Sequence, residues 1–400
     1  MRDALPSAAS RDLPLRGIVL LALAAFASSI NLRVSDPLLP VIAHELSATV
    51  GQASATVAAF AVGYGLLQLV FGPVGDRWGK LRVVGLTAVM AGVATAAVAL
   101  GSTLGSLIAL RFMAGGFAAA SIPLAFAWIG DVVPFEQRQT ILARFLTAQI
   151  SGIVLGQALG GYLGEVLGWR AVFVVVGAVH VLAGLALLVG LQLHPAVQPP
   201  PAKRRSIAGG ALADMLRLLS RRWVRVMLAS VAIEGFAFYG AFAYIGADLH
   251  HRLGVGLAAV GAMIATFALG AIAYTLTARR LLARLGERGL AAAGGILLCL
   301  GYAALALNAT VTLVPLVMVV LGLGFYMIHN TLQTNATQMA PEARGLGVSL
   351  FAFALFMGQS LGVALAAPLV DRLGAPAVYL VAAVLLPAVA LWFRSQLSRR

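Results

Sequence analysis

The sequence predicts an all-α polytopic membrane protein with twelve transmembrane helices in two pseudo-symmetric six-helix bundles. Apolar residues make up 61% of the 400 residues and charged residues only 10%, far outside the averages for soluble domains. Apolar stretches of about 20 residues, long enough to cross a bilayer core, recur along the chain. Backbone groups in lipid must form their hydrogen bonds internally, so these stretches are expected to be helices.

The apolar stretches follow one another in two groups of six. The first group lies near 17–41, 51–71, 83–101, 104–128, 140–164 and 171–191, and the second near 224–247, 255–277, 289–307, 312–337, 346–370 and 374–393. The long connection between them begins with four prolines and continues with basic residues. We therefore expect an N-terminal bundle over 1–193, a cytoplasmic linker over 194–222 and a C-terminal bundle over 223–400. Within the linker, Ile207–Leu219 has the spacing of an amphipathic helix on the membrane surface, and a disordered tether is the alternative.

Lysine and arginine predict the orientation in the membrane. Loops on one side, beginning with the N-terminus, carry nearly all of the 28 basic residues, including a run from Arg279 to Arg288 in the loop expected after the eighth span. The opposite loops carry only Arg170, Arg252 and Arg372. By the positive-inside rule, both termini are cytoplasmic and the protein lies in the cell (inner) membrane. Attraction to the anionic lipid leaflet explains the net charge of +14, so no nucleic-acid partner is expected.

Several classes of chemistry have no signature in the chain. Cys299 is the only cysteine, and the adjacent His250 and His251 lack a carboxylate–histidine cluster around them, so no metal site is expected. No nucleophile–base constellation indicates an enzyme, and no phosphate-binding glycine loop indicates ATP. No cofactor is expected.

The two halves repeat each other at an offset near 207 residues. Phe60–Gly63 recurs as Phe267–Gly270, and Arg77-Trp78-Gly79 recurs as Arg284-Leu285-Gly286. A slightly shorter offset relates Gly156-Gln157-Ala158-Leu159-Gly160 to Gly358-Gln359-Ser360-Leu361-Gly362. Two parallel repeats imply a substrate site between the bundles near the midplane, reached by rocking one half against the other.

The loop after the second span is rich in glycine and charge. Here the sequence resembles the major facilitator superfamily, whose loop between helices 2 and 3 has the form G-x-L-x-D-R-x-G-R-[KR]; the matching residues are Gly72, Asp76, Arg77, Gly79 and Lys80. Val74 replaces the leucine and Leu81 breaks the final basic pair. The resemblance implies that this loop gates the cytoplasmic side and that Asp76 closes on the start of helix 11 near Arg344-Gly345. The second-half copy has Ala283 in place of Asp76.

Two further patterns are similar to those of the same superfamily. The fourth span carries Leu107, Arg111 and Gly115 in the spacing L-x-x-x-R-x-x-Q-G, with alanine in place of the glutamine. Arg111 lies inside this apolar span and is expected to face the central cavity, unless it snorkels to the outer interface. The fifth span matches the exporter signature G-x-x-x-G-P-x-x-G-G through its glycines, with Gln157 in place of proline; these are Gly152, Gly156, Gly160 and Gly161. The match favours export, and close helix packing alone would also explain it.

Polar residues inside apolar spans are candidates for the functional site. Arg33 and Asp36 share a helix face at i,i+3 and form either a structural ion pair or a pair linked to substrate or protons. Glu234 has no base near it in sequence and lies beside aromatic residues such as Tyr239. Burial disfavours its charged form, so we expect it to bind a proton or a cation, with a purely structural carboxylate as the alternative.

The tenth span carries a polar stripe. His329 and Gln333 lie at helical spacing, with Tyr326 and Asn330 less closely aligned. Histidine titrates near neutrality, so His329 is a candidate ligand for substrate or protons, and a hydrogen-bonded packing residue is the alternative.

These features favour a secondary transporter that acts as a monomer. The first hypothesis is proton-coupled efflux of amphipathic small molecules by alternating access, as in the twelve-helix drug:proton antiporters that the chain resembles. The alternative is a proton-coupled transporter of a specific small anionic metabolite, because Arg33 and Arg111 are unusual in a site for cations. A non-transporting membrane sensor would need a signalling domain, for which the termini are too short. The expected partners are the substrate, protons and the lipid bilayer.

Overall fold

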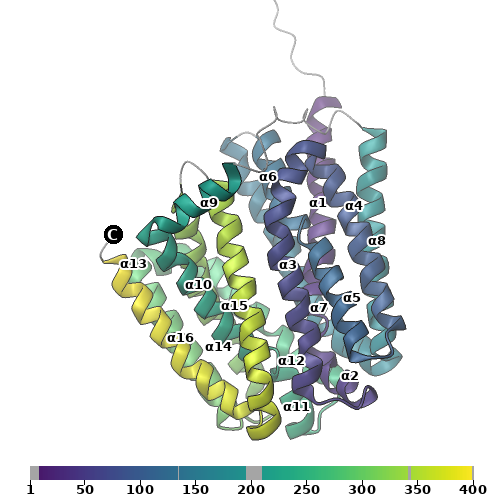
Figure 1. The fold of residues 1–400 in the computed structure, drawn as a ribbon. Helices are drawn as coiled ribbons and strands as arrows, with labels where there is room; N and C mark the ends of the chain where they lie inside the picture. The colour runs from purple at the N-terminus through teal and green to yellow at the C-terminus, as the bar shows by residue number, and fades with distance from the viewer. Residues whose placement is uncertain (1–8, 134, 195–209, 341–343, 399–400) are drawn as a thin grey trace, which may run out of the picture.

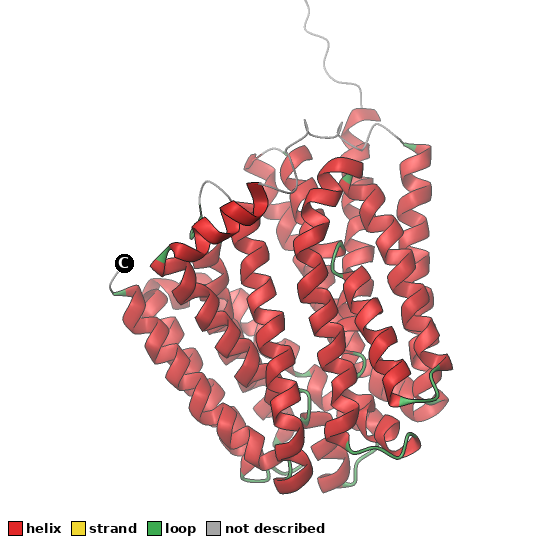
Figure 2. Cartoon of the chain, viewed as in Figure 1, coloured by secondary structure: helices red, strands yellow, loops and turns green. Residues whose placement is uncertain are grey.

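The computed structural model describes residues 9–133, 135–194, 210–340 and 344–398, and all regular structure in these ranges is helical (Figure 2). The first half contains α1 (Ala9–Arg33), η1 (Asp36–Leu38), α2 (Leu39–Glu45), α3 (Val50–Trp78), α4 (Lys80–Ala97), η2 (Val98–Leu100), α5 (Leu104–Ala118), α6 (Ser121–Val132), α7 (Phe135–Leu167) and α8 (Trp169–Leu193). The second half contains α10 (Arg222–Phe242), α11 (Ile245–Leu253), α12 (Leu257–Ala265), α13 (Phe267–Ala306), α14 (Val314–Ala336), α15 (Arg344–Leu373) and α16 (Ala375–Leu397). Between the halves lies α9 (Gly210–Ser220).

The described residues contain eleven stretches that are long and apolar enough to cross a membrane, and one of them accounts for two of the predicted spans. Leu257–Ala306 has 50 residues, which as a straight helix would be about 75 Å long, more than twice a bilayer core. It is interrupted at Gly286, whose φ of 62° and ψ of 177° are not helical. The stretch therefore forms two crossings, the predicted eighth and ninth spans.

The loop expected over 278–288 is helical instead, and this part of the prediction was wrong. Both helices continue past the ends of their apolar stretches and meet at Gly286. The equivalent residue of the first half, Gly79, has a φ of 92° and makes the same one-residue turn between α3 and α4. Only glycine adopts such positive φ values without steric cost, so a single residue replaces the loop at both places.

The first and seventh spans are broken at equivalent positions. The first stops at Arg33 and resumes as η1 at Asp36, and the seventh stops at Phe242 and resumes at Ile245. Pro37 directly follows the first break as the second residue of η1, and its missing N–H and its ring prevent α1 from continuing. At the first break Asp36 is fully buried, and its side chain contacts α7 while its backbone oxygen lies against Gly246 of α11.

The two halves lie side by side, with α1–α8 in purple to teal and α10–α16 in green to yellow (Figure 1). They meet where α3 packs against α15 and where α7 packs against α12. The four signature glycines of α7 permit close approach: a Cβ built on Gly156 would lie 2.7 Å from the Ile30 backbone oxygen, and those on Gly152 and Gly160 would also meet the backbone of the first span. Gly161 lies against Gly261 of α12, in the other half.

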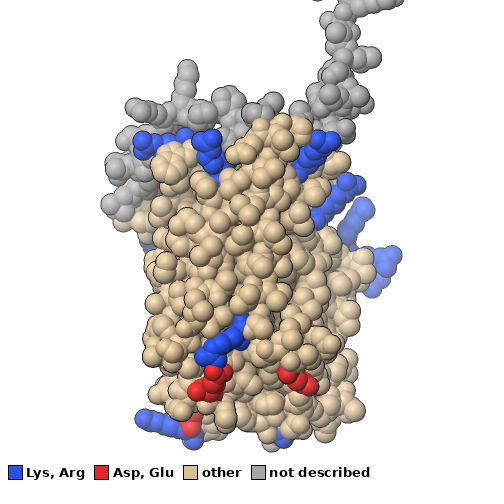
Figure 3. Space-filling view, turned by 90° about the vertical axis from the view of Figure 1, so that its right-hand side faces the viewer, with Lys and Arg blue, Asp and Glu red and all other residues tan. Residues whose placement is uncertain are grey.

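The surface agrees with a membrane setting. On the face drawn in Figure 3, most lysine and arginine side chains lie toward the upper end, and the acidic groups lie near the lower end together with a few further basic side chains. We call the end where α1 begins and α8 ends the basic end, and the end where α3 begins and α15 ends the opposite end. Large apolar side chains such as Leu182 and Leu276 are 65% and 79% exposed, as expected for contact with lipid. In the linker, α9 packs Leu218 into the core and exposes Leu216, so the described part is an amphipathic helix rather than a tether.

Candidate functional site

A buried ion pair lies at the break of the first span. Arg33 Nη1 is 3.6 Å from Asp36 Oδ2, and the side chains are only 4% and 0% exposed. Gln157 of α7 donates a hydrogen bond of 3.0 Å from Nε2 to the same carboxylate oxygen. The i,i+3 pairing expected from the sequence is therefore present, and the acid is held from a second helix.

Arg33 also reaches the other half of the molecule. Its guanidinium carbon lies 4.0 Å from the ring centroid of Tyr239 on α10, a cation–π distance. Its Nη2 is 3.5 Å from Oε1 of Gln359 on α15. A charge carried by the first half is therefore in contact with groups of the second half.

Glu234 and His329, far apart in sequence, are paired inside the second half. The Nδ1 atom of His329 on α14 lies 2.9 Å from Oε2 of Glu234 on α10, whose side chain is 0% exposed. The second carboxylate oxygen, Oε1, is buried and has no hydrogen-bond partner among the described residues. Glu234 thus has the base that the sequence alone did not reveal, and the pair can hold a proton between a carboxylate and an imidazole.

Aromatic rings connect the two polar clusters. Tyr239, which lies over Arg33, has its ring centroid 5.6 Å from that of Phe325. Phe325 stacks on the imidazole of His329 at 4.9 Å with an interplanar angle of 10°. A series of aromatic rings therefore runs from the ion pair of the first half to the Glu234–His329 pair of the second.

The remaining residues of the polar stripe on α14 lie outside this cluster. Asn330 Nδ2 donates a 3.0 Å hydrogen bond to the Tyr274 hydroxyl on α13. Gln333, one turn further along, is exposed. The structure thus joins His329 to Glu234 and directs its two predicted neighbours elsewhere.

Arg111 lies inside the first half and does not snorkel to an interface. It is 1% exposed, and its Nη1 donates a 2.6 Å hydrogen bond to Oδ1 of Asn31. Its guanidinium also lies 4.2 Å from the ring centroid of Phe60 on α3. These partners all belong to the first half, so Arg111 ties three of its helices together.

The charged residues predicted to gate the cytoplasmic side lie in a local cluster at the basic end. Lys80 Nζ lies 2.8 Å from Asp76 Oδ1 and 2.8 Å from Asp131 Oδ2, all within the first half. Arg77 is exposed, and a Cβ on Gly72 would meet nothing within 4 Å. The side chain of Arg344 lies outside the described residues, so closure of Asp76 on the start of α15, the eleventh predicted span, stays a prediction.

Two glutamines at the site were not among the predicted site residues. Gln157 holds Asp36 and Gln359 approaches Arg33, and they occupy equivalent positions of the repeated Gly-Gln segment. The repeat itself could have identified these two glutamines, because the same polar residue lies inside an apolar span of both halves. Asp131, the second carboxylate on Lys80, had no comparable signal.

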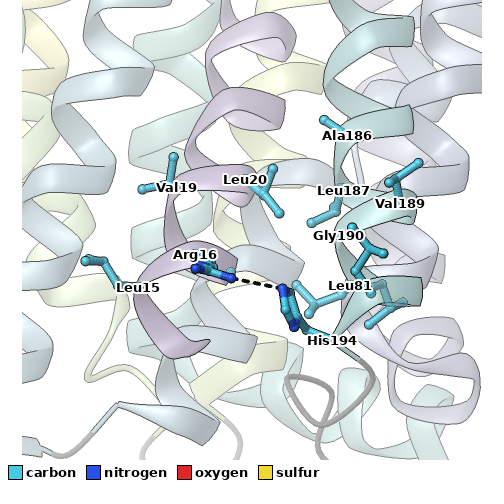
Figure 4. A pocket seen from close by; sticks show the side chains of 13 residues that line it. Leu15, Arg16, Val19, Leu20, Leu81, Ala186, Leu187, Val189, Gly190 and His194 are labelled. Carbon is cyan, nitrogen blue, oxygen red and sulfur yellow. Dashed lines mark hydrogen bonds between the residues drawn. The ribbon is translucent and has the colours of Figure 1, made fainter. Parts of the chain in front are cut away.

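An apolar cavity lies apart from these residues. It has a volume of about 580 Å³ between α1 and α8 near the basic end, and its walls are almost wholly aliphatic (Figure 4). Arg16 and His194 meet at its edge, 2.9 Å apart. Among the described residues, no group of three histidine, cysteine or acidic side chains could hold a metal ion.

Comparison with known proteins gives a consistent result. The family model described as Major Facilitator Superfamily matches residues 21–342 and 232–399. The chain is 29% identical over 355 residues to a chloramphenicol resistance protein of Streptomyces lividans, covering 88% of each chain. It is 28% identical over 216 residues to a bicyclomycin resistance protein homolog of Haemophilus influenzae, covering 54% of this chain and 52% of that one.

Solved structures of low sequence identity share the fold. The nucleoside transporter NupG superimposes with a TM-score of 0.75 at 13% identity, covering 97% of this chain and 100% of that one. A bacterial homolog of the human lysosomal transporter Spinster superimposes with a TM-score of 0.73 at 18% identity, covering 97% of both chains.

Proposed function

Since this chain belongs to the Major Facilitator Superfamily and is a membrane-spanning transporter rather than an enzyme, we propose that it exports amphipathic small molecules in exchange for protons by alternating access. The relatives named for chloramphenicol and bicyclomycin resistance support efflux. In this proposal the basic end faces the cytoplasm of a cell with an inner membrane, in keeping with the positive-inside rule.

The buried Glu234–His329 pair carries the proposal. With one bound proton the pair has no net charge, and without it the pair carries one negative charge. A buried site favours the neutral form unless a cation takes the place of the proton. The aromatic surface formed by Tyr239 and Phe325 offers such a substrate cation–π and apolar contacts next to the pair. Substrate and proton would then compete, which is the basis of antiport.

Glu234→Gln tests this proposal, because the amide mimics a permanently protonated carboxyl. In proteoliposomes, accumulation driven by a pH gradient is expected to be lost, whereas downhill exchange of the same substrate is retained. Glu287→Gln is the matched control: Glu287 also accepts a hydrogen bond from α14, through Asn335 at 3.0 Å, but it is exposed at the basic end. Accumulation at the wild-type level in Glu234→Gln would contradict the assignment.

One observation favours the alternative of a small anionic substrate. Arg33 Nη1 is buried without a hydrogen-bond partner among the described residues, and its nearest counter-charge, Asp36 Oδ2, is 3.6 Å away. An anionic group could displace Asp36 and bind this donor. The substitution Asp36→Asn leaves Arg33 without its counter-ion, so it would strengthen binding of an anionic substrate and leave binding of a cationic one unimproved. Titration of both substrate classes against this variant separates the two functions.

A further inference from the structure

Two acidic side chains at the opposite end join the halves of the molecule. Asp371, near the end of α15, accepts a 2.6 Å hydrogen bond at Oδ2 from the Thr49 hydroxyl and a 3.0 Å hydrogen bond at Oδ1 from the Gly51 backbone N–H. Thr49 is the N-cap of α3. The carboxylate of the second half therefore binds the first turn of a helix of the first half.

The mirror contact exists on the other side of the interface. Glu165, near the end of α7, accepts a 2.8 Å hydrogen bond at Oε2 from the Ala258 backbone N–H. Ala258 is the second residue of α12, whose N-cap Gly256 makes no side-chain capping bond. Here the carboxylate of the first half binds the first turn of a helix of the second half.

The two contacts are equivalent in the internal repeat. Thr49 and Gly256 differ by 207 residues, as do Gly51 and Ala258. Glu165 and Asp371 each stand two residues before the last residue of their helix, α7 or α15. In both, the backbone N–H of the second helical residue binds a carboxylate of the opposite half. Free N–H groups and the helix dipole favour a negative charge at this position.

The sequence also leaves room for each carboxylate. A Cβ built on Gly256 or Gly51 would collide with the carboxylate of Glu165 or Asp371. Two unrelated surface acids would not each require a glycine on the facing helix. At the basic end, by contrast, the described bonds of Lys80 stay within one half.

We propose that Glu165 and Asp371 are a pair of symmetric latches that hold the opposite end of the transporter closed and that must release before this end opens. The proposal rests on the alternating-access function proposed above. It names the residues that hold the outer gate, meaning the closure of the opposite end, in place. Each latch joins one half to the other, so both break when the halves separate at this end. The two together would bias the equilibrium toward the closed outer gate.

Distance measurements between spin labels test the latches in the full-length protein. Ser102→Cys and Thr312→Cys place one label in each half on exposed loops of the opposite end, in a Cys299→Ala background in lipid nanodiscs. Glu165→Ala with Asp371→Ala is expected to raise the ratio of long to short label distances about tenfold, as expected for the loss of two charge–helix contacts. An unchanged distance distribution in this double variant would overturn the proposal.

Two further variants separate latch loss from misfolding. Glu45→Ala is the matched control, because Glu45 lies at the same end but binds Trp169 and Arg170 of its own half. It should leave the distances unchanged. Gly51→Ala with Gly256→Ala keeps both acids but displaces them, and it should reproduce the opening. The label distances are measured without substrate and without a pH gradient. An unchanged distance distribution would therefore contradict the latches without contradicting proton-driven export, and loss of proton-driven export would not by itself contradict the latches.

Discussion

At the scale of single residues, the pairing of Glu234 with His329 turns two separate candidate residues into one candidate proton site. Each was recognisable in the sequence as a polar residue inside an apolar span, because lipid does not tolerate such groups without a reason. Their contact was not predictable, since 95 residues separate them and the packing of α10 against α14 depends on the whole bundle. Sequence reasoning therefore pointed to these two residues but not to the contact between them.

Arg111 offers a residue-scale prediction about stability. Asn31→Leu would remove the side-chain acceptor of a buried guanidinium and should lower the free energy of unfolding by about 2 kcal/mol. In the double variant Asn31→Leu with Arg111→Leu, no charge is left unpaired, so the loss should be smaller than the sum of the single losses. Thermal unfolding in detergent measures all three variants. Additive losses would contradict the pairing.

At the scale of helices, the glycines of α7 determine how closely it packs. Gly156→Ala places a Cβ 2.7 Å from the backbone oxygen of Ile30, and the backbone cannot move aside cheaply. We expect a loss of about 1–3 kcal/mol in the free energy of unfolding. Gly105→Ala in α5 is the control, because its Cβ meets nothing within 4 Å, and it should be neutral or stabilising. Equal thermal midpoints for the two variants would count against this packing role.

The helices themselves were largely predictable, and the exception is informative. Length and hydropathy marked every crossing, because the bilayer demands long apolar helices. The same rule failed over 278–288, where arginines suggested a loop and the structure has helix up to Gly286. Charged residues end the membrane-embedded stretch but do not end a helix, since arginine is a good helix former.

At the scale of the whole molecule, the repeat and the basic loops predicted the arrangement of two bundles with one orientation. The orientation is testable by labelling single cysteines at Ser398 and Ser102 with an impermeant thiol reagent on intact cells, in the Cys299→Ala background. Ser102 lies on a loop of the opposite end and should react, whereas Ser398, at the end of α16, should be protected. The reverse pattern would invert the proposed topology.

The one-residue turns at Gly79 and Gly286 limit how this molecule can move. Gly168 and Gly374 join α7 to α8 and α15 to α16 in the same way, with φ values of 81° and 79°. Two helices joined by a single residue have no spare chain length between them. Neither helix can therefore slide along its partner by a helical turn without unwinding. Eight of the twelve crossings thus belong to four stiff hairpins. Any large rearrangement must carry each hairpin as one piece, and the interrupted crossings, such as the first and the seventh, are the places where the chain can bend.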